Sequence, residues 1–156
     1  MKDEKKRAKA LLQEQSLPYA TWTGNLAIPI AMIVIFIIGL LGYGMSFYSI
    51  VILVATIQVH RFNAKLKLGN RSYIAPIMVY LYNVLSIPMA ILLLHLDNGE
   101  LLPLLLIELL FVATVVTAIV FFFITASQIK KQFPTLKADR QAALQVYKET
   151  LANLLK

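Results

Sequence analysis

The sequence contains no cysteine among its 156 residues, and charged residues are scarce. Without cysteine the chain has no disulfide, no zinc–thiolate or iron–sulfur ligand and no thiol nucleophile. Charged residues make up 15% of the chain, against about 25% in an average soluble domain. Hydrophobic residues make up 59%. This composition excludes a disordered chain, a coiled coil and an ordinary soluble enzyme.

Charge is missing from long continuous stretches of the sequence. No Asp, Glu, Lys or Arg occurs in residues 15–60 or 72–96, and Glu108 is the single one in residues 101–129. A helix needs about 20 apolar residues to cross the hydrocarbon core of a bilayer, so each of the last two stretches predicts one membrane-spanning helix. The first stretch is long enough for two helices, and the glycines within residues 42–46 favour a turn between them.

These patterns predict an all-α, polytopic integral membrane protein with four transmembrane helices in two hairpins and a cytoplasmic C-terminal amphipathic helix. The predicted spans are residues 24–41, 46–59, 72–96 and 101–127. They divide the chain into a basic amino-terminal segment (1–23), a transmembrane domain (24–129) and a cytoplasmic tail (130–156). The second span is short, about 21 Å at 1.5 Å per residue, so one span followed by a re-entrant segment remains an alternative for the first hairpin.

All 15 lysine and arginine residues lie in three segments, namely the amino-terminal segment, the connection between the second and third predicted spans, and the tail. With four spans these segments face the same side, which the positive-inside rule assigns to the cytoplasm. We therefore predict a plasma-membrane protein with both termini in the cytoplasm, where its basic residues contact anionic lipid headgroups. Nucleic-acid binding is not expected, because no basic folded face or aromatic platform is visible outside the membrane.

Three polar residues inside the predicted spans form a hypothetical intramembrane site. Glu108 lies about 10 Å below the outer end of its span, where a carboxyl group must be protonated or paired. Asn83 and Ser86 are three residues apart on the third span and therefore lie on neighbouring positions of one helix face. Together these groups can relay a proton or bind a cation, and the alternative is that they only hold the helices together.

Two further surfaces are predicted to pack against other helices. On the fourth span, small residues four apart permit close helix approach: Ala113 with Thr117, and Thr114 with Ala118. In the tail, after Pro134, apolar residues recur at helical spacing: Leu136, Ala143, Tyr147, Leu151 and Leu154. This stripe predicts an amphipathic helix that lies on the inner leaflet, or that pairs with a second subunit or a partner protein.

One short segment contains residue types that are capable of catalysis. His95, Asp97 and Glu100 flank Asn98-Gly99, which is the sequence of an ordinary turn, and they are the sole basis for an interfacial enzyme acting on lipid. No GxSxG, HExxH, P-loop or GxGxxG motif occurs in the chain. We therefore expect no enzymatic activity, no catalytic residue, no metal site and no cofactor.

Two functions fit these observations. The first is a non-enzymatic accessory, assembly or complex subunit, which binds a membrane protein partner or further copies of itself through its helix faces and its tail. The second is an oligomeric channel or transporter protomer for protons, cations or a small solute, with Glu108, Asn83 and Ser86 along the path. Packing explains nearly every polar residue in the spans, which favours the first.

Overall fold

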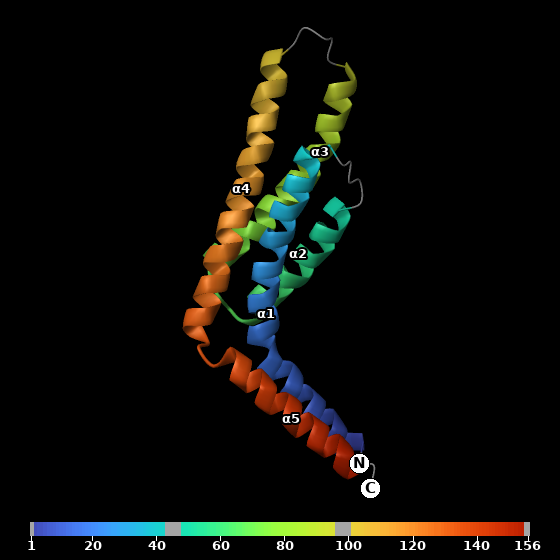
Figure 1. The fold of residues 1–156 in the computed structure, drawn as a ribbon, viewed down its shortest axis with the longest axis vertical. Coiled ribbons are helices and arrows are strands. Elements are labelled where there is room, and N and C mark those ends of the chain that lie inside the picture. Colours follow the sequence, from blue (N-terminus) through green and yellow to red (C-terminus); the bar gives the residue numbers. More distant parts are fainter. Residues whose placement is uncertain (1, 43–47, 96–100, 155–156) are drawn as a thin grey trace.

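The computed structural model describes residues 2–42, 48–95 and 101–154, and for residues 2, 88–95, 101–104 and 154 it describes the backbone alone. Over these ranges the chain is all-α, which confirms the helical part of the prediction. The elements are α1 (Lys2–Leu40), α2 (Tyr48–Lys65), the 3-10 helix η1 (Asn70–Tyr73), α3 (Ile74–His95), α4 (Leu101–Gln132) and α5 (Leu136–Leu154) (Figure 1).

Four helical segments form a bundle in which the chain runs alternately up and down (Figure 1). They are the second half of α1, followed by α2, α3 and α4. Within the bundle α1 packs against α2 and α4, and α3 packs against α2 and α4. The hairpin of α3 and α4 extends beyond the upper end of the hairpin of α1 and α2 (Figure 1).

Helix α1 is 39 residues long and continues through the predicted boundary between the amino-terminal segment and the first span. It contains Pro18 and Pro29. A proline inside a helix removes a backbone hydrogen bond and bends the helix, and α1 changes direction where it enters the bundle (Figure 1). The helix ends at Leu40, and Gly42 follows with a φ of 84°. The predicted turn therefore starts where expected, and its remainder, residues 43–47, lies outside the described residues.

Helix α5 runs antiparallel along the amino-terminal half of α1, so that both described ends of the chain lie close together (Figure 1). We call this pair, α5 with residues 2–22 of α1, the stalk. It projects from the lower end of the bundle (Figure 1). Thr135 directly precedes α5, and its hydroxyl donates a hydrogen bond of 2.8 Å to the Asp139 carboxylate in the first turn.

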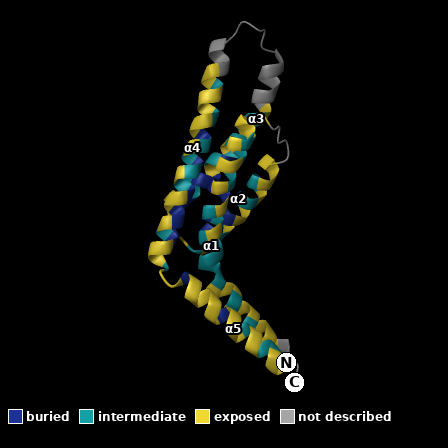
Figure 2. Ribbon diagram, viewed as in Figure 1, coloured by how far each residue is buried: buried dark blue, intermediate teal, exposed yellow. Residues whose placement is uncertain are grey.

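The outward faces of the bundle helices are strongly apolar, and Figure 2 shows how much of each helix is exposed. The exposed fraction reaches 73% at Leu40, 67% at Ile87 and 66% at Leu109. Within the described part of the chain, two helices are long and apolar enough to cross a membrane, Asp3–Leu40 and Leu105–Gln132. Only 17% of the apolar stretch of each is buried inside the protein. Exposed apolar surface on this scale indicates an interaction with lipid or with another protein.

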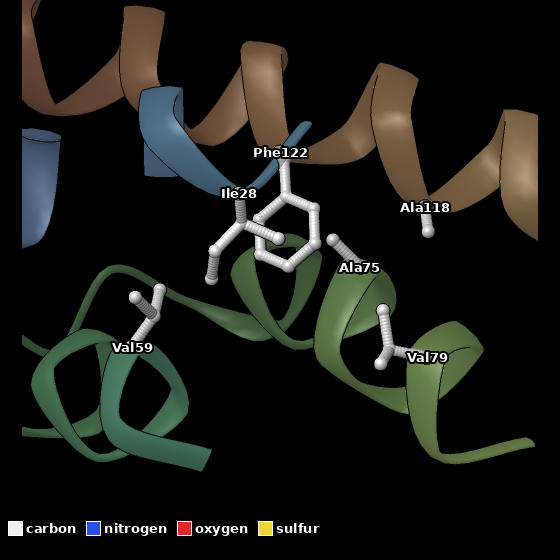
Figure 3. Packing of buried hydrophobic residues seen from close by; sticks show 6 residues of the cluster. All are labelled: Ile28, Val59, Ala75, Val79, Ala118 and Phe122. Carbon is white, nitrogen blue, oxygen red and sulfur yellow. The ribbon is translucent and has the colours of Figure 1, made fainter. Parts of the chain in front are cut away.

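The core of the bundle is small and is built where all four helices meet (Figure 3). Phe122 extends from α4 into the space between Ile28 of α1 and Ala75 of α3 (Figure 3). Val59, Val79 and Ala118 complete the buried cluster. A second cluster of Leu68, Ile129 and Leu136 joins the bundle to the stalk. The position of the stalk is therefore set by packing at both of its helices.

Candidate functional site

Near the lower end of the bundle, polar side chains from α1, α2 and η1 are fully buried. Asn25 Nδ2 donates one hydrogen bond of 2.9 Å to Asn63 Oδ1 and another of 2.8 Å to the carbonyl of Thr21. Asn63 Nδ2 in turn donates to the carbonyl of Ser72 at 3.0 Å. We call this chain of bonds the asparagine bridge. It connects three elements in a place without solvent, where each bond stabilises more than it does in water.

The sequence around Ser72 explains why the asparagine bridge ends there. Pro76 lies four residues later and has no N–H to donate to the Ser72 carbonyl. Asn63 supplies the missing donor, and the Ser72 hydroxyl donates a 2.7 Å hydrogen bond to the Gly69 carbonyl. Gln128 Nε2 of α4 also donates to the Leu68 carbonyl at 2.9 Å. The connection between α2 and α3 is therefore held by side chains from α2 and α4.

His60 lies one turn from this network and is packed between two tyrosines. Its Nδ1 is 3.0 Å from the Tyr80 hydroxyl. Its ring stacks on Tyr80 at a centroid distance of 5.7 Å and tilts against Tyr73 at 5.2 Å. The position of His60 beside Arg61 at the end of an apolar run is typical of a lipid-facing boundary residue. The structure instead places it, half-buried, as a contact between α2 and α3.

In the upper half of the bundle the four helices surround a partly open crevice of about 210 Å³. Met32, Ile52 and Val79 contribute to its apolar wall, and Asn83 and Thr114 contribute polar groups. Asn83 Nδ2 donates to the Val79 carbonyl at 2.8 Å. Of the two predicted site residues on α3, Asn83 therefore lines the crevice. Ser86 is half-buried and its hydroxyl donates to the Asn83 carbonyl at 2.7 Å.

Glu108 lies apart from the crevice, although its residue type made it the centre of the predicted site. Its side chain is exposed on α4, and within the described residues it makes no hydrogen bond or ion pair. The buried side of α4 contains Thr114 and Ala118, and Glu108 lies about 100° around the helix from that side. Phe111 packs edge-to-face on Tyr82 of α3 at 5.1 Å. The bundle of one chain therefore does not bring Glu108 and Asn83 together.

The four small residues predicted on α4 are divided between the interior and the surface. Ala118 is 0% exposed and Thr114 is 5% exposed, so this pair faces the interior. Thr117 is half-buried and Ala113 is exposed. The Thr114 hydroxyl donates to the carbonyls of Leu110 and Phe111 within its own helix. Close helix approach inside this chain therefore uses the pair Thr114 and Ala118.

The apolar stripe of the tail packs against α1 of the same chain, an arrangement that neither sequence interpretation included. Leu136 and Ala143 are buried, at 3% and 1% exposed. Tyr147 and Leu151 are half-buried, and the side chain of Leu154 lies outside the described residues. Sequence periodicity identifies such a stripe but not the surface that covers it.

Two cation–π contacts add to the packing at the top of the stalk. Arg140 Cζ lies 4.3 Å from the centre of the Tyr19 ring, and Lys137 Nζ lies 5.4 Å from the Trp22 ring. The two rings are themselves 5.9 Å apart. Each contact stabilises by about 0.5–1 kcal/mol when partly exposed to solvent. Tyr19 and Trp22 therefore help to bind the tail helix to α1.

No protein-family model, curated protein or solved structure matches this chain. Within the described residues no group of three or more His, Asp or Glu side chains is placed to hold a metal ion. The predicted outer cluster of His95, Asp97 and Glu100 lies outside the described side chains.

Proposed function

We propose that this chain is a small polytopic integral membrane protein that serves as a non-enzymatic accessory, assembly or complex subunit. In this proposal α1 to α4 cross the bilayer as two hairpins. The chain then binds a membrane protein partner through the outer faces of these helices and through the stalk.

The observation that carries the membrane proposal is that the bundle exposes large apolar side chains and buries polar ones, the reverse of a protein in water. Large aliphatic residues cover the outside, as at Leu40, Ile87 and Leu109, whereas Asn25 and Asn63 are fully buried. In water this arrangement would expose apolar surface and bury amides at the same time, and both are unfavourable. In lipid the exposed aliphatic side chains match the solvent, and the amide nitrogens of Asn25 and Asn63 donate hydrogen bonds inside the bundle.

The placement of the basic residues supports one orientation. The connection between α2 and α3, the connection between α4 and α5, and the stalk all lie at the lower end of the bundle (Figure 1). Every lysine and arginine that the structure describes belongs to one of these parts or to the lower end of α2 or α4. We infer that this end faces the cytoplasm of a plasma membrane, where these residues contact anionic headgroups.

Membrane insertion and orientation can be tested with single cysteines, because the natural sequence has none. We expect the protein to stay in the membrane pellet after alkaline carbonate extraction. Lys67→Cys should react with an impermeant maleimide from the cytoplasmic side, and Asn98→Cys from the opposite side. Labelling of both positions from one side would reject the four-span arrangement.

Partner binding can be tested on the outward face of α5. Leu144 and Val146 are 39% and 48% exposed although they belong to an amphipathic helix. We expect the double variant Leu144→Glu, Val146→Glu to lose membrane proteins that co-purify with the wild type in mild detergent. Gln141→Glu, a matched acidic substitution at an exposed site of α5, should retain them. Equal recovery from all three proteins would show that the stalk is not the binding surface.

A second candidate function is an oligomeric channel or transporter protomer. The crevice supports it, because the crevice touches all four bundle helices and contains Asn83. In that case Asn83→Leu should abolish ion or solute flux in proteoliposomes. If Glu108→Gln also abolishes flux, the Glu108 carboxyl group must line the conduction path. Because Glu108 lies apart from the crevice of its own chain, it would then reach the path through a neighbouring chain of the oligomer.

A further inference from the structure

The outer part of the α3–α4 hairpin has no cover from the rest of the bundle. Tyr82 and Phe111 form the ring contact between the two helices, and Tyr82, with Tyr48 at the start of α2, lines the crevice. Beyond this level α3 continues to His95 and α4 begins at Leu101. Figure 1 shows this part of the hairpin above the end of α1 and α2. A membrane helix can therefore lie beside α3 and α4 here without a clash with the first hairpin.

Glu108 lies on this uncovered part of α4, within an otherwise aliphatic surface. Leu105, Leu109 and Val112 are its neighbours on the helix surface, and they are 59%, 66% and 51% exposed. Glu108 itself is exposed and has no partner within the described residues. A carboxylate among aliphatic side chains at membrane depth is costly, and the cost is removed when the group is protonated or when a cation pairs with it. Among the described side chains of this face, none carries a positive charge.

A second copy of the chain in the same orientation cannot supply a lysine or arginine for Glu108. Within the described part of the chain, the lysine and arginine residues belong to the stalk, the α2–α3 connection or the lower ends of α2 and α4. They therefore lie at the opposite end of the bundle from Glu108 (Figure 1). A lysine or arginine at the depth of Glu108 must come from a different protein. A lysine or arginine satisfies an intramembrane carboxylate most directly, because each charge removes the cost of burying the other.

We propose that the α3–α4 face around Glu108 binds a transmembrane helix of another protein, and that this helix carries a lysine or arginine about 10 Å below the outer membrane boundary. The inference rests on the proposed function as a membrane subunit, and it adds the chemistry of the partner. Leu105 and Leu109 provide the apolar contacts on either side of the charge pair. Specificity comes from Glu108, since an aliphatic helix can pack on the same leucines but leaves the carboxyl group unpaired.

A peptide of defined sequence tests this proposal. The full-length protein, labelled with a donor dye at Asn98→Cys, is reconstituted in lipid vesicles with a leucine-rich transmembrane peptide that carries an acceptor dye. One peptide has a single lysine seven residues from its outer end, and its control has leucine there. We expect energy transfer to show about tenfold tighter association of the lysine peptide. Glu108→Gln should bind both peptides equally, and Glu149→Gln, at an exposed acid of α5, should keep the preference.

Charge reversal provides a positive result that a damaged protein cannot produce. Glu108→Lys should prefer a peptide with glutamate at the same position over the lysine peptide. Equal binding of the lysine and leucine peptides by the wild type overturns the proposal. Self-association of the wild type that is lost in Glu108→Gln also overturns it, because a second copy then occupies the face.

Carbonate extraction of the same vesicles separates the two proposals. Release of the wild-type protein into the supernatant would reject the membrane proposal, and the inference with it. Retention without a preference for the lysine peptide would reject the inference alone.

Discussion

Asn25 of α1 and Asn63 of α2 are joined by a buried hydrogen bond of 2.9 Å, although 38 residues separate them in the sequence. Because Asn63 also donates to the carbonyl released by Pro76, one side chain fixes both the pairing of α1 with α2 and the start of α3. Loss of the Asn63 side chain therefore leaves buried groups of α1 and η1 without the partner that they have in the bundle.

Replacing Asn63 should weaken the bundle strongly. Asn63→Ala leaves the Asn25 amide and the Ser72 carbonyl without their present partner, and each buried unsatisfied group costs about 1–3 kcal/mol. We expect the free energy of unfolding to fall by about 2–4 kcal/mol, measured by titration with a denaturing detergent. Asn153→Ala, at an exposed position of α5, should change it by less than about 0.5 kcal/mol. Equal stability of the two variants would contradict the role of the bridge.

Two glycines of α1 should respond in opposite directions to the same substitution. A methyl group at Gly24 would lie 2.5 Å from Val59 Cγ2, whereas Gly39 has no atom within 4 Å. The β-branched Val59 has little freedom to move away. Gly24→Ala should therefore destabilise by about 1–3 kcal/mol, and Gly39→Ala should stabilise by up to about 1 kcal/mol. Midpoints of thermal unfolding in detergent test both signs.

Adjacent alanines of α5 should differ in their effect on the stalk. Ala143 is 1% exposed and Ala142 is exposed. Ala143→Glu places a charge in the contact with α1, and α5 should separate from it. Limited proteolysis should then cut near Thr135 at least about tenfold faster than in the wild type. Ala142→Glu should be cut at the wild-type rate. The fluorescence of Trp22, the single tryptophan of the chain, should shift in the first variant only.

The hydroxyl of Tyr80 should contribute to stability, whereas that of Tyr82 should not. Tyr80 shares a 3.0 Å hydrogen bond with His60, while the contact of Tyr82 with Phe111 is made by its ring. Tyr80→Phe should lower the free energy of unfolding by about 0.5–1.5 kcal/mol. Tyr82→Phe keeps the ring contact and should be nearly neutral. A larger loss for Tyr82→Phe would indicate a hydrogen bond from its hydroxyl that the structure does not show.

Much of the architecture follows from features that are local in the sequence. Charge-free stretches predict helices of the observed kind, Gly42 predicts the end of α1, and Pro134 predicts the break before α5. The length of α1 cannot be predicted from local features. Pro18 and the basic residues before it suggest a helix boundary, but the helix continues through this region. The spacing of apolar residues predicts which face of a helix is apolar. Which other helix covers that face depends on how all the helices pack together.

The polar site was harder to predict than the fold for the same physical reason. Asn83 is recognisable because it interrupts an apolar span. Asn63 lies among basic residues at the end of α2, where an exposed loop is the natural expectation, and its partner Asn25 is distant in the sequence. Glu108 is conspicuous by residue type, but its orientation depends on which face of α4 meets α3. Burial of polar groups is a property of the assembled bundle.

The pairing of α5 with the amino-terminal half of α1 also imposes an order on biosynthesis. During translation, the α1 surface that carries Tyr19 and Trp22 emerges long before α5, because the whole bundle is encoded between them. At about 5–20 residues per second, this surface stays bare for several seconds. For that time the amino-terminal half of α1 lacks the helix that packs against it in the folded chain.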